Sequence, residues 1–226
     1  MVDSPADSAP RGLRERAKTK RRIAIQRAAL ELFVERGFEA TTISNVAERA
    51  EVARRTVMMY FPAKIDLALS WFDEMGVRLQ AAFAASPSNP DFVSVLEQWL
   101  GAEAATQDPQ LAALAWDLLE SDPRLRALSR SRMVARLTTQ TADAFALRTG
   151  LEPDRPMFAI AGQAVAAATD EYLATTARHG YRPELHRDFL RFLRRITDAD
   201  SPADSAPTPV HSRVFDSDQA SSPPPS

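Results

Sequence analysis

Residues 41–64 read TTISNVAERAEVARRTVMMYFPAK, and two short apolar-periodic segments within them are separated by a break at residues 51–53. The first segment spans residues 43–50, and the second spans residues 54–61 and is stopped by Pro62. Two short helices joined by a turn of three or four residues form a helix-turn-helix, whose second helix enters the major groove of DNA. The stretch therefore predicts a DNA-binding motif.

Apolar side chains at helical spacing should face the inside of this motif and leave a polar outer surface. A preceding helix is predicted over about residues 20–36 with Gly37 at its C-cap, and Thr42 suits the N-cap of the next helix. In the second helix of the motif, Val57 and Phe61 lie four residues apart and should point inward. Its N-terminal end and outer faces are then formed by Arg54, Arg55, Thr56, Met58, Met59 and Tyr60.

The charge of the chain is unevenly divided, although its net value is only -2. Residues 11–64 carry 13 Lys and Arg against 6 Asp and Glu, whereas residues 65–226 carry 15 against 22. A basic front and an acidic body are typical of a DNA-contacting head on a separate regulatory domain. The most basic segment is residues 11–22, and it is compatible both with a flexible phosphate-binding arm and with a solvated lead-in to a helix.

Four blocks within about residues 25–69 carry a family resemblance: AALELF at 28–33, ERGF at 35–38, RRT at 54–56 and YFPAK at 60–64. Together they resemble the DNA-binding domain of the tetracycline-repressor-like (TetR) family of bacterial transcription regulators. The resemblance implies phosphate contacts from Thr41, Thr42, Tyr60 and Lys64, and major-groove contacts from Arg54, Arg55, Thr56 and Met59. The full predicted DNA-contacting set is Thr41, Thr42, Arg54, Arg55, Thr56, Met58, Met59, Tyr60, Lys64, Arg21 and Arg22.

Three positions depart from the pattern that this resemblance implies. Glu51 stands where the family usually has Gly in the turn, and a positive φ there would strain Glu by about 1 kcal/mol. Ala53 replaces the usual Ser or Thr N-cap of the recognition helix, which removes roughly another 1 kcal/mol. Met58 replaces a phosphate-binding Tyr, so one hydroxyl contact should be missing. These departures bear on DNA affinity rather than on the fold.

The rest of the chain predicts an all-α fold of about nine helices, because Ala, Leu and Arg are abundant and only 7 of 226 residues are Gly. Beyond the motif, helices are expected at about residues 63–84, 91–106, 109–120, 123–148, 153–178 and 183–197. Residues 11–62 should form the DNA-binding domain, and residues 63–197 a ligand-binding and dimerisation domain. Residues 1–10 and 198–226 are rich in Pro, Ser and Asp and should be disordered.

The last two predicted helices suit either a dimer interface or an internal core. The segment 153–178 is apolar nearly all round and rich in small residues, and the segment 183–197 has one apolar stripe. The resemblance favours a four-helix bundle with a second copy, which would place two recognition helices about 34–36 Å apart on a near-palindromic operator. The predicted interface residues are Ile160, Ala164, Ala168, Leu185, Phe189, Leu193 and Ile196.

The resemblance also implies a pocket in the body whose occupant changes the separation of the two DNA-binding heads. The candidate lining residues are Phe72, Met75, Trp99, Trp116, Met133, Gln140, Phe145, Gln163, Asp170 and Tyr172. For each aromatic residue or Met taken alone, packing in the core is the competing interpretation. As a set they indicate an apolar effector, either acyl or polycyclic.

Other classes of function find little support. The three histidines, His179, His186 and His211, show no metal-binding spacing, and the chain has no Cys, GxGxxG or P-loop. No catalytic residue, metal site or cofactor is therefore predicted. The most apolar run, residues 157–168, is too short to span a bilayer, so a cytoplasmic location without membrane association is expected.

The combined prediction is a dimeric, ligand-responsive transcription factor, acting as a repressor. One alternative is a ligand-binding or scaffolding homodimer whose degenerate helix-turn-helix no longer reads DNA. A less favoured alternative is an all-α enzyme that uses the body pocket.

Overall fold

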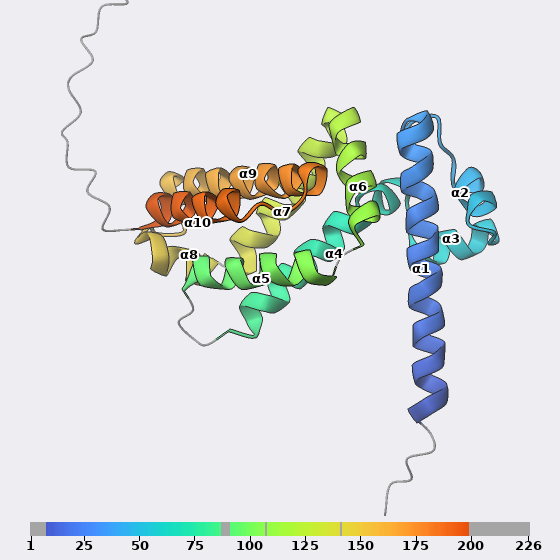
Figure 1. Cartoon of the computed structure of the whole chain (residues 1–226), viewed down its shortest axis with the longest axis horizontal. Coiled ribbons are helices and arrows are strands. Elements are labelled where there is room, and N and C mark those ends of the chain that lie inside the picture. The colour runs from blue at the N-terminus through green and yellow to red at the C-terminus, as the bar shows by residue number, and fades with distance from the viewer. Residues whose placement is uncertain (1–7, 87–90, 107, 141, 199–226) are drawn as a thin grey trace, which may run out of the picture.

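The computed structural model describes residues 8–86, 91–106, 108–140 and 142–198, which form ten α-helices and no strand (Figure 1). The helices are α1 (Ser8–Arg36), α2 (Ile43–Arg49), α3 (Arg54–Tyr60), α4 (Lys64–Ala84), α5 (Phe92–Thr106), α6 (Pro109–Ser121), α7 (Pro123–Gln140), α8 (Ala142–Thr149), α9 (Pro156–His179) and α10 (Pro183–Thr197). The predicted all-α class is confirmed. About nine helices are predicted; the helix expected over 123–148 corresponds to α7 and α8, which are separated only by residue 141, outside the described residues.

The helices form an N-terminal head and a larger body (Figure 1). The head consists of α1, α2 and α3, and the body contains α5 to α10, with α9 and α10 side by side along one edge. Helix α4 packs against α1 in the head and against α5, α6 and α7 in the body. It is therefore the helix through which the head is joined to the body, and α6 adds a second contact with α1.

The helix-turn-helix forms as the sequence predicts. Thr42 is the N-cap of α2, where its side chain accepts a hydrogen bond from the N–H of Asn45 and the Asn45 side chain accepts from the N–H of Thr42. This reciprocal pair is a capping box. Val57 of α3 and Phe61 at its end are buried in the same core cluster as Phe33 of α1. Helix α2 packs against both α1 and α3, so the inner faces of the motif belong to the core of the head.

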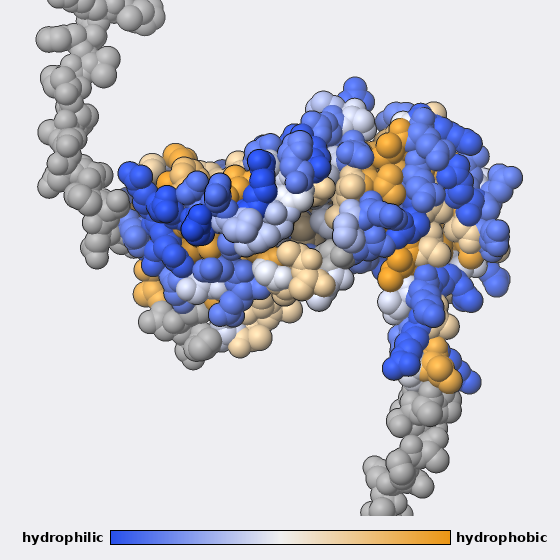
Figure 2. Space-filling model, in the orientation of Figure 1, coloured by the Kyte–Doolittle hydropathy of each residue, from blue (hydrophilic) through white to orange (hydrophobic). Residues whose placement is uncertain are grey.

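Helix α1 is longer than predicted and corrects two expectations. It begins at Ser8 rather than near residue 20, so the basic segment 11–22 is helical and not a flexible arm. Its Arg, Lys, Ala and Leu residues favour helix. Figure 1 shows this part of α1 extending beyond the head, and Figure 2 shows that its surface is largely polar. Residues 8–10, expected to be disordered, form its first turn, and the other expected disordered segments, 1–7 and 199–226, lie outside the described residues.

The turn before α3 contains both departures expected to weaken the motif. Glu51 has a φ of 53°, and it is the one residue other than Gly with positive φ in the part of the chain that the structure describes. Ala53 occupies the N-cap of α3 and makes no side-chain capping hydrogen bond. The strain and the missing cap predicted from the sequence are therefore confirmed.

Replacing Glu51 with Gly should stabilise the protein. Relief of the left-handed conformation is worth about 1–2 kcal/mol, and the greater freedom of Gly in the unfolded chain offsets part of it. We expect Glu51→Gly to raise the free energy of unfolding by about 0.5–1 kcal/mol in urea denaturation. Glu48→Gly is the matched control, because Glu48 is exposed within α2 and Gly there should destabilise by about 1 kcal/mol. If Glu51→Gly is no more stable than the parent protein, Glu51 is not strained by its left-handed conformation.

Candidate DNA-binding and ligand-binding sites

Helix α3 presents a basic and apolar outer face to solvent. Arg54 and Arg55 are exposed, and neither forms an ion pair or hydrogen bond with any described residue. Met58 and Met59 are 41% and 71% exposed, respectively, whereas Val57 on the inner face is 0% exposed. Thr56 and Tyr60 are half-buried at the edges of this outer face. The predicted recognition face is therefore accessible to a duplex.

Lys64, predicted to contact a phosphate, binds within the chain in this structure. Its ammonium donates hydrogen bonds to the carbonyl oxygens of Phe38, Glu39 and Thr41 at 2.9, 3.3 and 3.2 Å. It also lies 4.3 Å from the centre of the Phe38 ring. An ammonium has three donors, and all three hold the segment between α1 and α2 against the start of α4.

The two threonines before α2 are also engaged within the chain. The Thr41 side chain is buried, and its hydroxyl proton faces the carbonyl oxygens of Leu32 and Gly37 at 3.1 and 2.9 Å. Thr42 is exposed, but its hydroxyl and its N–H both donate to Asn45 Oδ1, at 2.7 and 3.0 Å. In this structure Thr41 anchors the segment and Thr42 caps α2, and their phosphate contacts stay a prediction.

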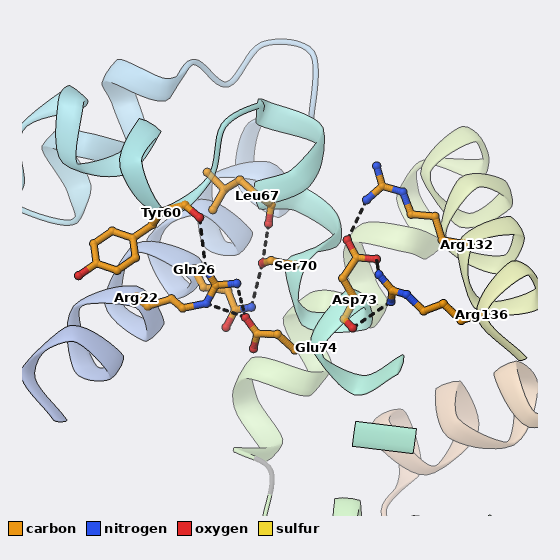
Figure 3. Close-up of polar contacts among 9 residues, drawn as sticks. All are labelled: Arg22, Gln26, Tyr60, Leu67, Ser70, Asp73, Glu74, Arg132 and Arg136. Carbon is orange, nitrogen blue, oxygen red and sulfur yellow. Dashed lines mark hydrogen bonds and ion pairs between the residues drawn. The ribbon is translucent and has the colours of Figure 1, made fainter. Parts of the chain in front are cut away.

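Arg22, predicted to contact DNA, instead joins three helices. Its guanidinium donates twice to Glu74 Oε1 of α4, at 2.8 and 2.6 Å, and once to the carbonyl oxygen of Tyr60 at the end of α3, at 3.3 Å (Figure 3). It also stacks on the Phe61 ring at 4.3 Å. The Tyr60 ring points away from this junction (Figure 3). Arg21, by contrast, is exposed without an ion pair among the described residues.

The other polar contacts of α4 hold it from two sides (Figure 3). Toward α1, Gln26 Nε2 donates to Ser70 Oγ at 2.8 Å, and both residues are buried. Toward α7, the Asp73 carboxylate accepts from Arg132 at 2.8 Å and from Arg136 at 2.9 Å. Helix α4 is thus fixed by named contacts both to the head and to the body.

A cavity of about 650 Å³ opens between α4, α5, α6, α9 and the start of α10. Its volume falls in the range of small-molecule sites. The lining residues that carry rings or polar groups are Trp71, Glu103, Trp116, Tyr172, Thr176, Tyr181 and His186.

Only part of the predicted pocket set lines this cavity. Met75, Trp116 and Tyr172 line it. Phe72, Trp99, Met133 and Asp170 line, together with Met75, a separate space of about 20 Å³. That space has room for about one water molecule, so these four residues are corrected to core positions.

Two more of the predicted ligand residues, Phe145 and Gln163, lie away from the cavity, and the Asp170 carboxylate is paired with arginines. Phe145 packs between Phe92 and Phe158, with ring centroids 5.2 Å from each, and Gln163 is exposed on α9. Asp170 forms ion pairs with Arg130 and Arg126 at 2.6 and 3.6 Å. The side chain of Gln140 lies outside the described residues.

The sequence interpretation missed Trp71, Tyr181 and His186. Trp71 stands four residues before Met75, so helical periodicity alone would have placed it on the same wall. His186 shows no sequence signal for this position, and its Nδ1 lies 2.7 Å from the Tyr172 hydroxyl. Burial raises the pKa of Tyr172, so this hydroxyl stays protonated and can donate at neutral pH.

The predicted dimer residues divide between core and surface. Phe189 and Leu193 are buried in the core of the same chain, which contradicts their assignment to an interface, and Leu185 and Ala168 are half-buried against that core. Ile160 and Ala164 on α9 and Ile196 on α10 are exposed. The exposed apolar residues that the prediction missed are Met157 and Phe192.

Comparison with known proteins identifies the family. The sequence model for bacterial regulatory proteins of the tetR family matches residues 25–70. The chain is also 33% identical over 209 residues to the HTH-type transcriptional regulator TcmR of Streptomyces glaucescens, a match that covers 80% of this chain and 91% of that protein. The chain belongs to the TetR family. The resemblance noted in its helix-turn-helix is confirmed, and the chain is a TetR-family transcriptional regulator.

Solved structures agree with this TetR-family fold. Salmonella enterica GusR superposes with a TM-score of 0.54 at 20% identity, covering 79% of this chain and 95% of that one. The fatty acid degradation regulator FadR from Bacillus halodurans gives a TM-score of 0.51 at 19% identity, covering 77% and 94%. At these identities the likeness concerns the fold alone.

In the described part of this TetR-family regulator, no helix combines the length and apolar character needed to cross a membrane. In the same residues, no three His, Asp or Glu side chains are grouped so that they could hold a metal ion.

Arg55→Ala should weaken specific DNA binding by about 1–3 kcal/mol, because an exposed arginine on a recognition helix can bind guanine O6 and N7 with two hydrogen bonds. A mobility-shift titration on DNA from upstream of the protein's own gene, at fixed salt, measures the effect. Arg191→Ala is the matched control, since Arg191 is an exposed arginine on α10 paired with Asp188 at 2.9 Å. Unchanged affinity and specificity in Arg55→Ala would exclude the assigned role.

Arg22 and Glu74 should affect DNA binding as a pair. If Arg22 positions α3 through Glu74, then Glu74→Ala and Arg22→Ala should each weaken binding by about tenfold, because each leaves the other side chain unpaired. The double variant should be no weaker than either single one. If Arg22 instead binds a DNA phosphate, only Arg22→Ala should lose affinity. It alone should then also reduce the slope of log binding constant against log salt concentration, by about one.

Proposed function

We propose that the protein is a dimeric repressor whose affinity for a near-palindromic operator falls when an apolar effector occupies the large body cavity. One observation carries this proposal: a single turn of α4 reaches both the cavity and the recognition helix. Trp71 and Met75 line the cavity, and Glu74 binds the Arg22 side chain that holds the end of α3. Residues at spacings of three and four share one face of a helix. An occupant that displaces this turn therefore acts directly on the support of α3.

The required coupling between the two sites is modest. Allosteric effects on binding typically amount to about 1–3 kcal/mol, and an effector needs only that difference in affinity between the two conformations. A displacement that weakens one charge-assisted contact, such as that between Arg22 and Glu74, is of the same order. The contacts of Asp73 with Arg132 and Arg136 hold the opposite side of α4 to α7, so a local push on Trp71 would pivot α4 rather than release it.

A homodimer is the second part of the proposal, and its support is the exposed apolar surface of α9 and α10. Met157, Ile160, Phe192 and Ile196 are 54%, 57%, 49% and 38% exposed, and the two helices lie side by side. Figure 2 shows apolar patches interrupting the polar surface of this part of the body. Two such faces related by a two-fold axis would form a four-helix bundle and cover these side chains. Only as a dimer would the chain present two recognition helices to the two halves of an operator.

A mobility-shift assay with DNA from upstream of the protein's own gene tests the regulator role most directly. We expect a sequence-specific complex that competitor DNA of scrambled sequence does not displace. The variant Arg54→Ala/Arg55→Ala serves as the negative control. If the folded dimer does not bind the upstream DNA at modest salt, the result favours the competing hypothesis. That hypothesis is a ligand-binding or scaffolding homodimer with a degenerate helix-turn-helix.

Ile160→Asp should convert the dimer to a monomer, because it would bury two unpaired carboxylates at the two-fold interface. Sedimentation velocity or light scattering after gel filtration measures the mass. Val77→Asp is the matched control, since Val77 is similarly exposed, at 55%, on α4 rather than on α9 or α10. The interface is elsewhere if Ile160→Asp remains dimeric, or if Val77→Asp dissociates equally.

A further inference from the structure

We propose that the projecting first part of α1 is a second DNA contact, in which Arg14, Lys18 and Arg21 bind phosphates next to the half-site that α3 reads. These three residues are called the basic row. The contact rests on the proposed function, since it supposes that α3 reads an operator, and it adds affinity that is independent of base sequence. Its support is the exposure, the spacing and the unbalanced charge of this segment.

The first part of α1 is exposed on all its faces. Every residue from 12 to 21 is exposed, whereas Ile25 and Leu32, later in the same helix, are 0% and 1% exposed. Figure 1 shows this part of α1 extending past α2 and α3. At about 1.5 Å per residue, the segment 8–21 is roughly 20 Å long. Its side chains therefore add little to the core of the head and are accessible to a partner.

The basic row continues the face of α1 that is buried in the head. Each residue of a helix advances by about 100°, so residues 4, 7, 11 or 18 apart share a face. Arg21 lies four residues before Ile25, Lys18 lies seven before it, and Arg14 lies eleven before it. Arg14 also lies eighteen residues before Leu32. The row is therefore on the side of α1 on which Ile25 and Leu32 enter the core of the head.

Three ion pairs show which helices lie around α1. Arg22 is paired with α4, Glu35 with α2, and Arg27 with the N-cap residue of α6. By the same rotation of about 100° per residue, the basic row falls between Arg22 and Glu35. This is the side of α1 on which α2 and α3 lie, with α6 on the other side (Figure 1). Arg16 and Lys20 fall on either side of Arg27, toward α6.

The exposed segment carries positive charge that the chain does not balance. Residues 12–21 include five Lys and Arg and one acid. None of these five cations forms an ion pair with a described residue, whereas Arg22 and Arg27, later in α1, are both paired. Like charges four residues apart, such as Arg14 and Lys18, also destabilise a helix. A polyanion removes this repulsion, and DNA gains further affinity because bound cations release its counterions.

A duplex fits this surface better than a second protein does. Arg54 and Arg55 of α3 are exposed without ion pairs among the described residues, so the basic row and the recognition helix present positive charge on the same side of α1. The acidic body of a second copy is the competing occupant, because residues 65–226 carry 15 Lys and Arg against 22 Asp and Glu. Acids of the body such as Glu103 are, however, already bound by its own arginines.

Two double variants with the same change of charge test the contact. Arg14→Gln/Lys18→Gln removes two members of the basic row, and Arg16→Gln/Lys20→Gln removes the same two residue types, at the same spacing, from the opposite face. Gln keeps the helix propensity of Arg and Lys, and circular dichroism checks the fold. On DNA from upstream of the protein's own gene, we expect the first variant to bind about tenfold more weakly at about 0.1 M salt. It should also reduce the slope of log binding constant against log salt concentration by about two, and the second variant should keep the slope of the parent.

The position of the contact is measured by hydroxyl-radical footprinting. From Arg14 to Arg21 the basic row spans about 10 Å, which corresponds to roughly three base pairs at about 3.4 Å each. The parent and the Arg16→Gln/Lys20→Gln variant should protect such a block beside each half-site, and Arg14→Gln/Lys18→Gln should not. Because phosphate contacts carry no base information, the same variant should also lose affinity for a duplex of scrambled sequence.

Each other outcome overturns a different statement. If the two double variants bind with equal affinity and equal salt slope, the basic row does not contact DNA. If neither loses DNA affinity, and only Arg14→Gln/Lys18→Gln reduces association beyond the dimer in sedimentation velocity without DNA, the occupant is a second copy. A parent protein that does not prefer upstream to scrambled DNA refutes the regulator role, whereas equal behaviour of the two variants on a specific complex refutes only the contact by α1.

Discussion

The contacts of the Arg22 guanidinium are the interaction on which the position of the head relative to the body depends. The guanidinium contacts the Glu74 carboxylate of α4, the last carbonyl oxygen of α3 and the ring of Phe61, and it arises from α1. Arginine suits this position because its planar fork can serve several acceptors at once while its face stacks on an aromatic ring. The pair is about one-third exposed, so its value lies in orientation more than in stability. The end of the recognition helix α3 is consequently held in position relative to α4.

Helix α4, together with the contact of α6 with α1, connects the body to the head. Its Asp73 faces α7, its Ser70 bonds to Gln26 of α1, and its Trp71 and Met75 border the large cavity. These contacts leave few independent motions, because packed interiors shift between discrete arrangements rather than deform continuously. In the proposed mechanism, a change at the cavity and a change at the Arg22 junction are two aspects of one displacement of α4.

The sequence predicts the elements well because their signals are local. The Thr42 cap, the Val57 and Phe61 spacing and the Glu51 strain all depend on residues within one or two turns. The side-chain partners do not: Arg22 and Glu74 are 52 residues apart, and whether a basic residue meets DNA or a carboxylate is not encoded nearby. On α10 two apolar pairs of identical spacing, Phe189 with Leu193 and Phe192 with Ile196, differ only in which neighbour covers them. Periodicity finds such stripes but cannot assign them to the core or the surface.

The weak local energetics of α3 fit its dependence on tertiary contacts. A helix of seven residues is unstable in isolation, and the strained Glu51 and the uncapped Ala53 remove about 2 kcal/mol more. What holds α3 is therefore the burial of Val57 and Phe61, with Arg22 binding its last carbonyl oxygen and Lys64 fixing the segment before α2. The position of a recognition helix stabilised in this way depends on the position of the elements that support it. Helix α4 acts on α3 indirectly, through Glu74, which binds Arg22, and through Lys64, which holds the segment before α2. In the proposed mechanism a small shift of α4 therefore changes the orientation of α3, whose own local structure is weak.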